Sequence, residues 1–175
     1  MAQAQSGCFT TRQAASAGYS PQLLSYLGSK KVRRIRRTIY RPVHFPASEH
    51  EELVEPWLWS EQAGVFSHLT ALALYDLSDA LPAQLHLTVP RFWQRRRLRV
   101  PPGVVLHFAD VEERDQTRCG AVPITSPLRT LQDCLAALVD PTLLRQAIHQ
   151  ARQRGLVSAK EEAELRSHLG TEAAA

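Results

Sequence analysis

Three helix start and stop signals follow one another near the N-terminus, and they constrain the fold of this region more than any other feature. Thr10 and Gln13 form the T-x-x-Q pattern of a capping box, which marks the first turn of a helix. Gly18 is suited to the left-handed conformation that ends a helix, and Ser20-Pro21 supplies an N-cap followed by a proline at the first helical position. The sequence therefore predicts two short helices joined by a glycine-containing turn, the arrangement of a helix-turn-helix.

The second of these helices is predicted to have one apolar and one polar side. Leu23, Leu24 and Leu27 cluster on a helical wheel, and Tyr19 and Leu24 are placed to form a hydrophobic staple across the N-cap. The opposite side carries hydroxyl and amide groups that can bond base edges or phosphates in a major groove; its residues are Gln22, Ser25 and Ser29, with Tyr26 on the flank. Any soluble helix has a polar outer side, so this pattern alone does not establish nucleic-acid binding.

A basic hairpin is predicted directly after the two helices. The segment VRRIRRTIYR, residues 32–41, alternates roughly as a short hairpin, with Val32, Ile35, Ile39 and Tyr40 expected to face a core. Arginine side chains on such a wing can reach the phosphate backbone or a narrow minor groove. Five arginines occupy the hairpin, and they are Arg33, Arg34, Arg36, Arg37 and Arg41.

The charges are distributed unevenly along the chain. The formal net charge is +4, yet residues 1–46 contain eight basic residues and no acidic one. A solvated surface is the ordinary explanation of one charge run, but here the run coincides with a predicted winged helix-turn-helix, which favours a polyanion as partner. We therefore expect double-stranded DNA to bind through Thr11, Arg12, Ser20, Gln22, Ser25, Tyr26, Ser29, Lys30, Lys31, Arg33, Arg34, Arg36, Arg37 and Arg41.

A second basic cluster lies in the middle of the chain, and two interpretations of it remain open. In one, the cluster extends the DNA-binding surface or docks an acidic partner, with Phe92 and Trp93 as interface aromatics. In the other, it is a solvated loop anchored by a buried tryptophan. The cluster consists of Arg91, Arg95, Arg96, Arg97 and Arg99.

The composition and the cysteine spacing indicate in which compartment the protein occurs and argue against membrane and secreted proteins. The 44% of apolar residues is enough to build a core, and no apolar run approaches the ~18 residues of a membrane span. The first residues lack the apolar segment of a secretory signal. Cys8, Cys119 and Cys134 are odd in number and widely spaced, which argues against a disulfide framework. These features predict a cytoplasmic protein that does not contact a membrane.

The remainder of the chain predicts a mixed helix–strand domain. A Ser48/Glu51 capping box should open a helix that Pro56 breaks or kinks, and Ser67 should cap the apolar helix HLTALALYDL. Strands are expected at residues 84–89, 104–108 and 121–125. Three helices then follow: one after Ser126 with an apolar stripe, one from 140 to 155, and one at 158–169. The apolar stripe of the helix after Ser126 consists of Leu128, Leu131, Leu135 and Leu138. The helix at 140–155 is expected to bury Leu143, Leu144, Ala147, Ile148 and Ala151. The helix at 158–169 begins with a Ser158/Glu161 capping box.

Together these elements predict an α+β fold in which a winged helix-turn-helix precedes a mixed helix–strand domain that ends in helices. The expected boundaries are 1–46 for the DNA-binding domain, 47–170 for the C-terminal domain and 171–175 for a flexible tail.

Five stretches of the chain, in this order and spacing, resemble the antitoxin family of abortive-infection (AbiE) toxin–antitoxin systems: FTTRQAASAGYSPQLLSYL, VRRIRRTIYRP, FSHLTALALYDL, LHLTVP and VPITSPLRTLQD. The resemblance extends from Phe9 to about Leu169. It implies a winged helix-turn-helix regulator that represses its own toxin–antitoxin operon by binding promoter repeats. The chain departs from the family's pattern in having only eight residues before Phe9, where a helix usually stands, and in having Thr38 where the wing turn often has glycine.

The resemblance also implies a partner. The toxin of such systems is a nucleotidyltransferase, so an alternative function is direct neutralisation of that toxin in a protein complex, with DNA binding secondary. Because regulators of this kind read repeated half-sites, two protomers can pair on the DNA.

Enzymatic and metal-dependent functions are not expected, and no cofactor is predicted. None of the three lysines stands two residues after an acid, as a nuclease E-x-K motif requires, and no D-x-D pair exists for a nucleotidyltransferase. The seven histidines are scattered along the sequence, and the cysteines lack metal-ligand spacing. Ser67 and His68 are expected to point in different directions, and His86 is interpreted as a satisfied residue of a strand. Arg129 and Asp133 stand four residues apart on one helix, which predicts a structural ion pair.

Overall fold

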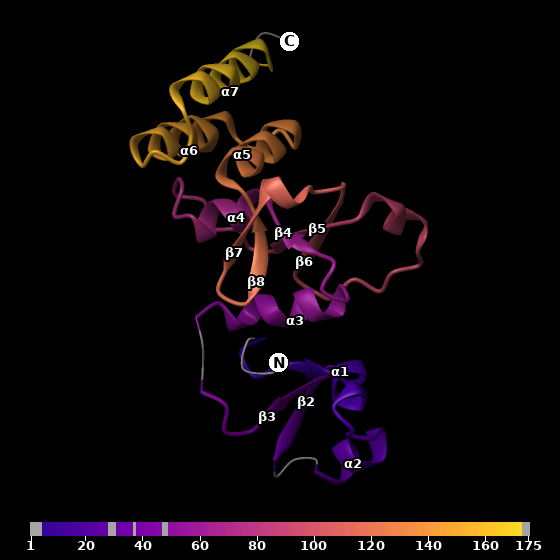
Figure 1. Ribbon diagram of the computed structural model, residues 1–175. Helices are drawn as coiled ribbons and strands as arrows, with labels where there is room; N and C mark the ends of the chain where they lie inside the picture. Colours follow the sequence, from indigo (N-terminus) through magenta and orange to yellow (C-terminus); the bar gives the residue numbers. More distant parts are fainter. Residues whose placement is uncertain (1–4, 28–30, 37, 47–48, 173–175) are drawn as a thin grey trace. The chain divides into compact units, whose positions relative to one another are not determined.

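The computed structural model describes residues 5–27, 31–36, 38–46 and 49–172. Its contacts divide the chain into two compact units (Figure 1). The first comprises Met1–Ala63 with Gly120–Val122, and the second comprises Gly64–Cys119 with Pro123–Ala175. The domain boundary expected at residues 46 and 47 rests on linker composition and stays a prediction.

The first unit contains a small antiparallel sheet and short helices. Its elements are β1 (Phe9–Thr10), α1 (Thr11–Ser16), α2 (Pro21–Tyr26), β2 (Val32–Arg36), β3 (Ile39–Pro42) and α3 (Glu51–Trp59). The strand order is β1-β3-β2. Two short helices followed by a hairpin is the order that the sequence predicts.

The helix signals in the sequence form the expected caps. The Thr10 hydroxyl accepts a hydrogen bond from the backbone N–H of Gln13 at 3.2 Å, and the Gln13 side chain accepts one from the N–H of Thr10 at 2.9 Å. Gly18 has a φ of 86°, which favours glycine. The Ser20 hydroxyl accepts a hydrogen bond from the N–H of Leu23 at 3.1 Å. Both helices begin at the predicted caps, and each is six residues long.

A bulge interrupts the hairpin. Arg34 pairs with Tyr40 and Arg36 pairs with Ile39, so Ile35 is the extra residue in β2. Directly paired residues share a face of the sheet, which places Arg36 on the side of the buried Ile39 and Arg34 on the other side. The bulge therefore replaces the simple alternation that the sequence pattern predicts.

The start of α3 differs from the prediction. The helix begins at Glu51 after His50, which is left-handed (φ 57°) and makes no side-chain cap bond. Ser48, the expected cap, lies outside the described residues. The helix also continues through Pro56 to Trp59, so the expected break does not occur. A proline removes one intrahelical donor, and this helix tolerates that loss.

The second unit is built around a mixed five-stranded sheet of order β6-β5-β4-β8-β7. Its strands are β4 (Val65–Phe66), β5 (Leu85–Val89), β6 (Val104–Phe108), β7 (Gln116–Cys119) and β8 (Val122–Thr125). β5 and β6 are parallel, β4 is antiparallel to β5, and β4 is parallel to β8. Three of these strands match the predicted ones, whereas β4 and β7 were not predicted.

The described residues of this unit form the helices α4 (His68–Leu74), α5 (Pro127–Ala136), α6 (Pro141–Gln153) and α7 (Ala159–Glu172). Figure 1 shows α5, α6 and α7 following the sheet at the C-terminal end of the chain. Two short 3-10 helices, η2 (Arg91–Arg95) and η3 (Glu113–Asp115), lie in the connections. The fold is thus α+β, with a helix–strand region at the N-terminus, a mixed sheet and C-terminal helices.

The core of the second unit lies between these helices. The predicted inward residues of α5 and α6 are largely confirmed, since Leu131, Leu144 and Ile148 are each no more than 1% exposed. Leu138 is an exception: it is 73% exposed with a φ of 54°, because α5 ends at Ala136 and the helical period no longer applies. The cluster comprises Leu72, Leu77, Leu131, Cys134, Leu135, Leu144, Ala147, Ile148, Ala151, Val157, Leu165 and Leu169.

The last two helices are separated as predicted. Gly155 follows α6 with a φ of 67°. The Ser158 hydroxyl accepts a bond from the N–H of Glu161 at 3.2 Å, and the Glu161 carboxylate accepts one from the N–H of Ser158 at 2.6 Å. All three cysteines are free thiols. Within the described ranges, no helix is both long enough and apolar enough to cross a membrane.

Candidate nucleic-acid interface

The predicted DNA-contacting residues of α1 and α2 are largely on the surface. Arg12, Gln22 and Ser25 are exposed, and Tyr26 is 86% exposed. Thr11 is half-buried. Because α2 is anchored through the buried Leu24, its outer side presents amide, hydroxyl and phenol groups together. Ser20 is exposed as well, although its hydroxyl oxygen accepts the capping bond described above.

The hairpin arginines differ in what they contact. Arg33 and Arg34 are exposed, as is Lys31 directly before the hairpin. The Arg34 side chain donates a hydrogen bond to the carbonyl of Arg36 at 3.1 Å. Arg36 instead forms an ion pair with Glu55 of α3.

Arg41 is held more firmly than the other hairpin arginines. Its guanidinium lies 2.7 Å from the carboxylate of Glu51 on α3 and donates to the carbonyls of Phe45 and Pro46. The hydrogen bond to Glu51 raises the pKa of Arg41 above its ordinary value. The side chain is only 13% exposed. Arg36 and Arg41 thus connect the hairpin to α3, whereas Arg33 and Arg34 present their side chains to solvent.

Three residues of the predicted interface lie outside the described part of the chain: Ser29, Lys30 and Arg37. Their contribution to an interface stays a prediction.

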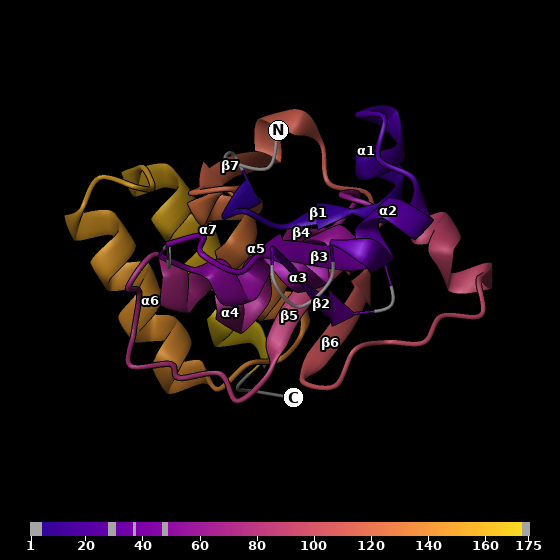
Figure 2. The same ribbon diagram turned by 90° about the horizontal axis from the view of Figure 1, so that it is seen from below.

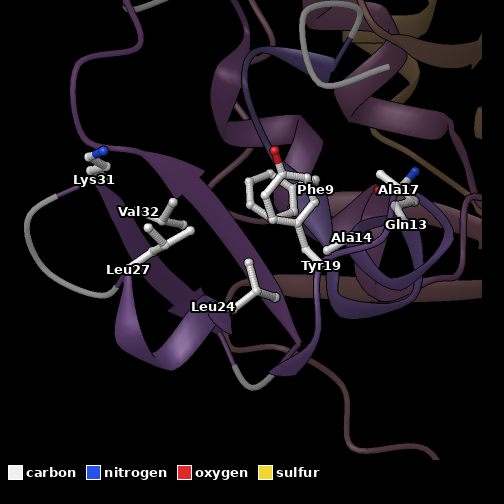
Figure 3. A pocket seen from close by; sticks show the side chains of 9 residues that line it. All are labelled: Phe9, Gln13, Ala14, Ala17, Tyr19, Leu24, Leu27, Lys31 and Val32. Atoms are coloured by element: carbon white, nitrogen blue, oxygen red, sulfur yellow. The ribbon is translucent and has the colours of Figure 1, made fainter. Parts of the chain in front are cut away.

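An apolar groove lies beside the candidate interface. It has a volume of about 350 Å³ and is lined by side chains of α1, α2 and the start of β2 (Figure 3). Residues 5–8 precede it as a turn, in which the N–H of Cys8 bonds the carbonyl of Gln5 at 2.8 Å. The lining residues are Phe9, Gln13, Ala14, Ala17, Tyr19, Leu24, Leu27, Lys31 and Val32.

The second basic cluster occupies the connection between β5 and β6. Its five arginines are exposed, and Figures 1 and 2 show this connection extending beyond the two strands. Trp93 is 4% exposed, and the Arg96 guanidinium lies 4.3 Å from the centroid of its ring. Phe92 is 61% exposed. The loop is therefore anchored by a buried tryptophan, as one of the two interpretations requires, and also presents an aromatic side chain to solvent.

The structure brings together three histidines that the sequence analysis treated as scattered. His68, His86 and His107 place ring nitrogens within 4.8 Å of one another. His86 Nδ1 is 2.9 Å from His107 Nε2, so His86 is bonded within its sheet as expected, but to another histidine. The sequence offered no local signal, because the three residues come from different elements and only the sheet register unites them.

The expectation for Ser67 and His68 was wrong. The Ser67 hydroxyl lies 2.8 Å from His68 Nδ1. It makes no hydrogen bond to the backbone of the helix that Ser67 precedes. Burial, together with the neighbouring His107 and His86, lowers the pKa of His68 to about 3. Burial also lowers the pKa of His107 to about 4. Both imidazoles are therefore neutral at neutral pH.

The predicted ion pair of α5 is confirmed and has a third member. Arg129 lies 2.7 Å from Asp133 and 3.2 Å from Asp115, which precedes β7. Burial raises the pKa of Asp133 above its ordinary value, although Arg129 acts in the opposite direction. The arrangement links α5 to the connection before β7.

Comparison with known proteins addresses the N-terminal region. No curated protein matches the chain significantly. Residues 2–43 match a family model described as "Transcriptional regulator, AbiEi antitoxin". The matched range covers α1, α2 and the complete basic hairpin. Over residues 2–43 the chain is therefore similar to the AbiEi antitoxin family of transcriptional regulators.

Proposed function

We propose that the chain is a cytoplasmic antitoxin that represses its own toxin–antitoxin operon by binding double-stranded DNA through the N-terminal unit. The observation that carries the proposal is that the family-matched residues and the acid-free residues are the same part of the chain. The segment that matches the regulator family, residues 2–43, falls within the part of the chain that contains no acidic residue. A segment with such an excess of positive charge attracts the phosphate backbone irrespective of base sequence.

The exposed side chains divide into two kinds of contact. Arg12, Lys31, Arg33 and Arg34 are suited to phosphates. Gln22 and Ser25, on the outer side of α2, are suited to base edges. We assign Arg36 and Arg41 to holding the hairpin against α3, since both already have carboxylate partners. Pairing of two protomers on repeated half-sites completes the proposal.

Fluorescence anisotropy with a labelled duplex from the chain's own upstream region tests the proposal. We expect tighter binding to this duplex than to a scrambled one, and a steep loss of affinity with salt. Replacing Arg33 and Arg34 by Gln should weaken binding to both duplexes and reduce the slope of log K against log salt by about two, because each lost phosphate contact contributes about one unit.

Two further variants serve as a matched control and as a test of specificity. Arg152→Gln combined with Arg166→Gln removes the same charge from exposed positions in the C-terminal helices and should leave DNA affinity nearly unchanged. Gln22→Ala should reduce discrimination between the two duplexes more than it reduces affinity for the scrambled one. Equal binding of wild type and the Arg33/Arg34 variant would overturn the proposed interface.

A direct complex with a nucleotidyltransferase toxin is the second candidate, and the connection between β5 and β6 favours it. Arginines beside an exposed aromatic ring are typical of protein interfaces, and Phe92 is 61% exposed among them. Reversing the charge of Arg95 and Arg97 with Glu should abolish co-purification with the toxin if the complex forms there. Unchanged co-purification would exclude this surface.

A further inference from the structure

A cluster of three imidazoles lies on one side of the sheet in the second unit. β5 and β6 are parallel, with His86 paired to Val105 and Thr88 paired to His107. Paired residues of neighbouring strands point to the same face, and residues two apart along a strand do so as well. His86 and His107 therefore share a face, and His68 reaches it from the first turn of α4.

Hydroxyl groups fix the beginning of α4 against this face. The Ser67 hydroxyl lies 2.6 Å from the hydroxyl of Thr88 and 2.8 Å from His68 Nδ1. The Thr70 hydroxyl accepts a hydrogen bond from the backbone N–H of His86 at 2.7 Å. His68 itself has a φ of 51°, a left-handed conformation that is costly for a non-glycine residue.

The three rings are close and nearly parallel. The centroids of His68 and His107 are 3.5 Å apart with an angle of 14° between the planes. His86 Nδ1 and His107 Nε2 are 2.9 Å apart. Nitrogens bound to one tetrahedral Zn²⁺ at about 2.0–2.1 Å are separated by roughly 3.3 Å. The pair is thus near coordination spacing, and one ring nitrogen from each of the three histidines lies within 4.8 Å of the other two.

A cavity with an unsatisfied carboxylate oxygen adjoins the cluster. Its volume is about 400 Å³, and its lining includes His68, His107, Thr88 and Asp133. Asp133 Oδ2 is buried and has no hydrogen-bond partner among the described residues. Buried polar atoms are nearly always satisfied, so an orphaned oxygen here indicates a further polar group in the cavity. A metal ion with bound water would supply one.

We propose that His68, His86 and His107 bind a divalent transition-metal ion of the Zn²⁺ class, with an open coordination position facing the cavity at Asp133. Imidazole nitrogens suit Zn²⁺, Cu²⁺, Ni²⁺ and Fe²⁺ better than Mg²⁺ or Ca²⁺. Three protein ligands leave the fourth tetrahedral position for water. Asp133 lines the same cavity, and its unpartnered carboxylate oxygen would be an acceptor for that water. The three histidines stand outside residues 2–43 in the sequence, so the proposed site does not depend on the proposed DNA binding.

The wild-type chain, freed of metal by a chelator, provides the first test. Titration with Co²⁺ should produce the visible absorption bands of a four-coordinate site. One equivalent of Zn²⁺ per chain should displace the Co²⁺ and abolish these bands. Zn²⁺ should also raise Tm in proportion to log concentration, because an ion that binds the native state stabilises it. Mg²⁺ should do neither.

Single variants assign the site to the cluster. Loss of even an outer hydrogen bond to a metal ligand costs about 10- to 100-fold in affinity, so His86→Gln and His107→Gln should each weaken Zn²⁺ binding at least that much in calorimetry. His149→Gln is the matched control, since His149 is exposed on α6 outside the cluster. Circular dichroism of the metal-free variants shows whether they fold.

Two outcomes overturn the proposal. One is a wild-type chain that shows no four-coordinate Co²⁺ spectrum and no Zn²⁺-dependent rise in Tm. The other is Zn²⁺ affinity that is unchanged in folded His86→Gln and His107→Gln chains. If either variant fails to fold, the wild-type spectrum and the Tm series decide the question by themselves.

Discussion

At the scale of single residues, the ion-paired carboxylates of the second unit make the sharpest predictions. Arg129 lies between Asp115 and Asp133, and both it and Asp133 are at most 20% exposed. Removing one member of a buried ion pair leaves an uncompensated charge, which costs about 3 kcal/mol. We expect Arg129→Met to lower the free energy of unfolding by that amount at pH 7, measured by urea denaturation.

The loss should depend on pH. The pKa of Asp133 is already raised by burial, and removal of Arg129 eliminates the interactions that lower it. A folded-state pKa above the unfolded one means that the native state loses stability as pH rises through the folded pKa. The variant should therefore be least affected near pH 4 and most affected at pH 7. Arg166→Met is the control: its side chain is 47% exposed in the pair with Glu162, and the change should alter stability by less than about 0.5 kcal/mol at both pH values. A uniform loss across pH would contradict the explanation.

Residue-level signals in the sequence predicted local structure well and long-range structure poorly. The Thr10/Gln13 box and the Ser158/Glu161 box both form, because a cap depends only on residues within one turn. The proximity of His68 to His107 had no such signal, since it depends on strand register and on the placement of α4. The contacts of Ser67 were also not predicted, because its hydroxyl hydrogen-bonds the hydroxyl of Thr88 on β5 rather than the backbone of the helix that follows Ser67.

At the scale of elements, the end of α5 distinguishes two leucines that the sequence pattern treats alike. Leu131 is fully buried, whereas Leu138 is 73% exposed beyond the helix. We expect Leu131→Ala to lower the free energy of unfolding by about 2–5 kcal/mol. Leu138→Ala should change it by less than about 0.5 kcal/mol. Chemical denaturation of both variants checks the difference, and similar losses would mean that the helix extends further.

The elements that escaped prediction are the short ones. β4 has two residues and β7 has four, so neither is long enough to show a hydrophobic period. Their pairing is set by the neighbouring strands, which is tertiary information. The start of α2 was predicted because Ser20 and Pro21 mark it locally, and the hairpin was predicted from the spacing of its apolar residues. Within the hairpin, the sequence pattern identified the arginines but not their partners, since Glu51 and Glu55 lie on a helix that follows a linker.

At the scale of the whole molecule, the separation of charge matters more than its sum. Residues 1–46 hold eight basic residues and no acid, while the rest of the chain holds thirteen basic and seventeen acidic residues. A polyanion therefore interacts with one region rather than with the average surface.

Chromatography on immobilised heparin tests this separation. Arg33→Gln/Arg34→Gln and Arg152→Gln/Arg166→Gln lower the net charge equally, so net charge alone predicts the same shift in elution. We expect the first pair to elute at clearly lower salt than wild type and the second pair to elute close to wild type. Equal shifts would show that total charge governs the interaction.

The bulge at Ile35 also has a genetic consequence. In the sequence RRIRR the arginines look equivalent. The extra residue of the bulge places Arg36 on the face of Ile39, where Arg36 pairs with Glu55, and Arg34 lies on the opposite face of the hairpin. The positions are not interchangeable, so one arginine cannot compensate for the loss of another. A damaging change at Arg36 should be suppressible by a second mutation at Glu55, whereas suppressors of changes at Arg34 should map outside α3.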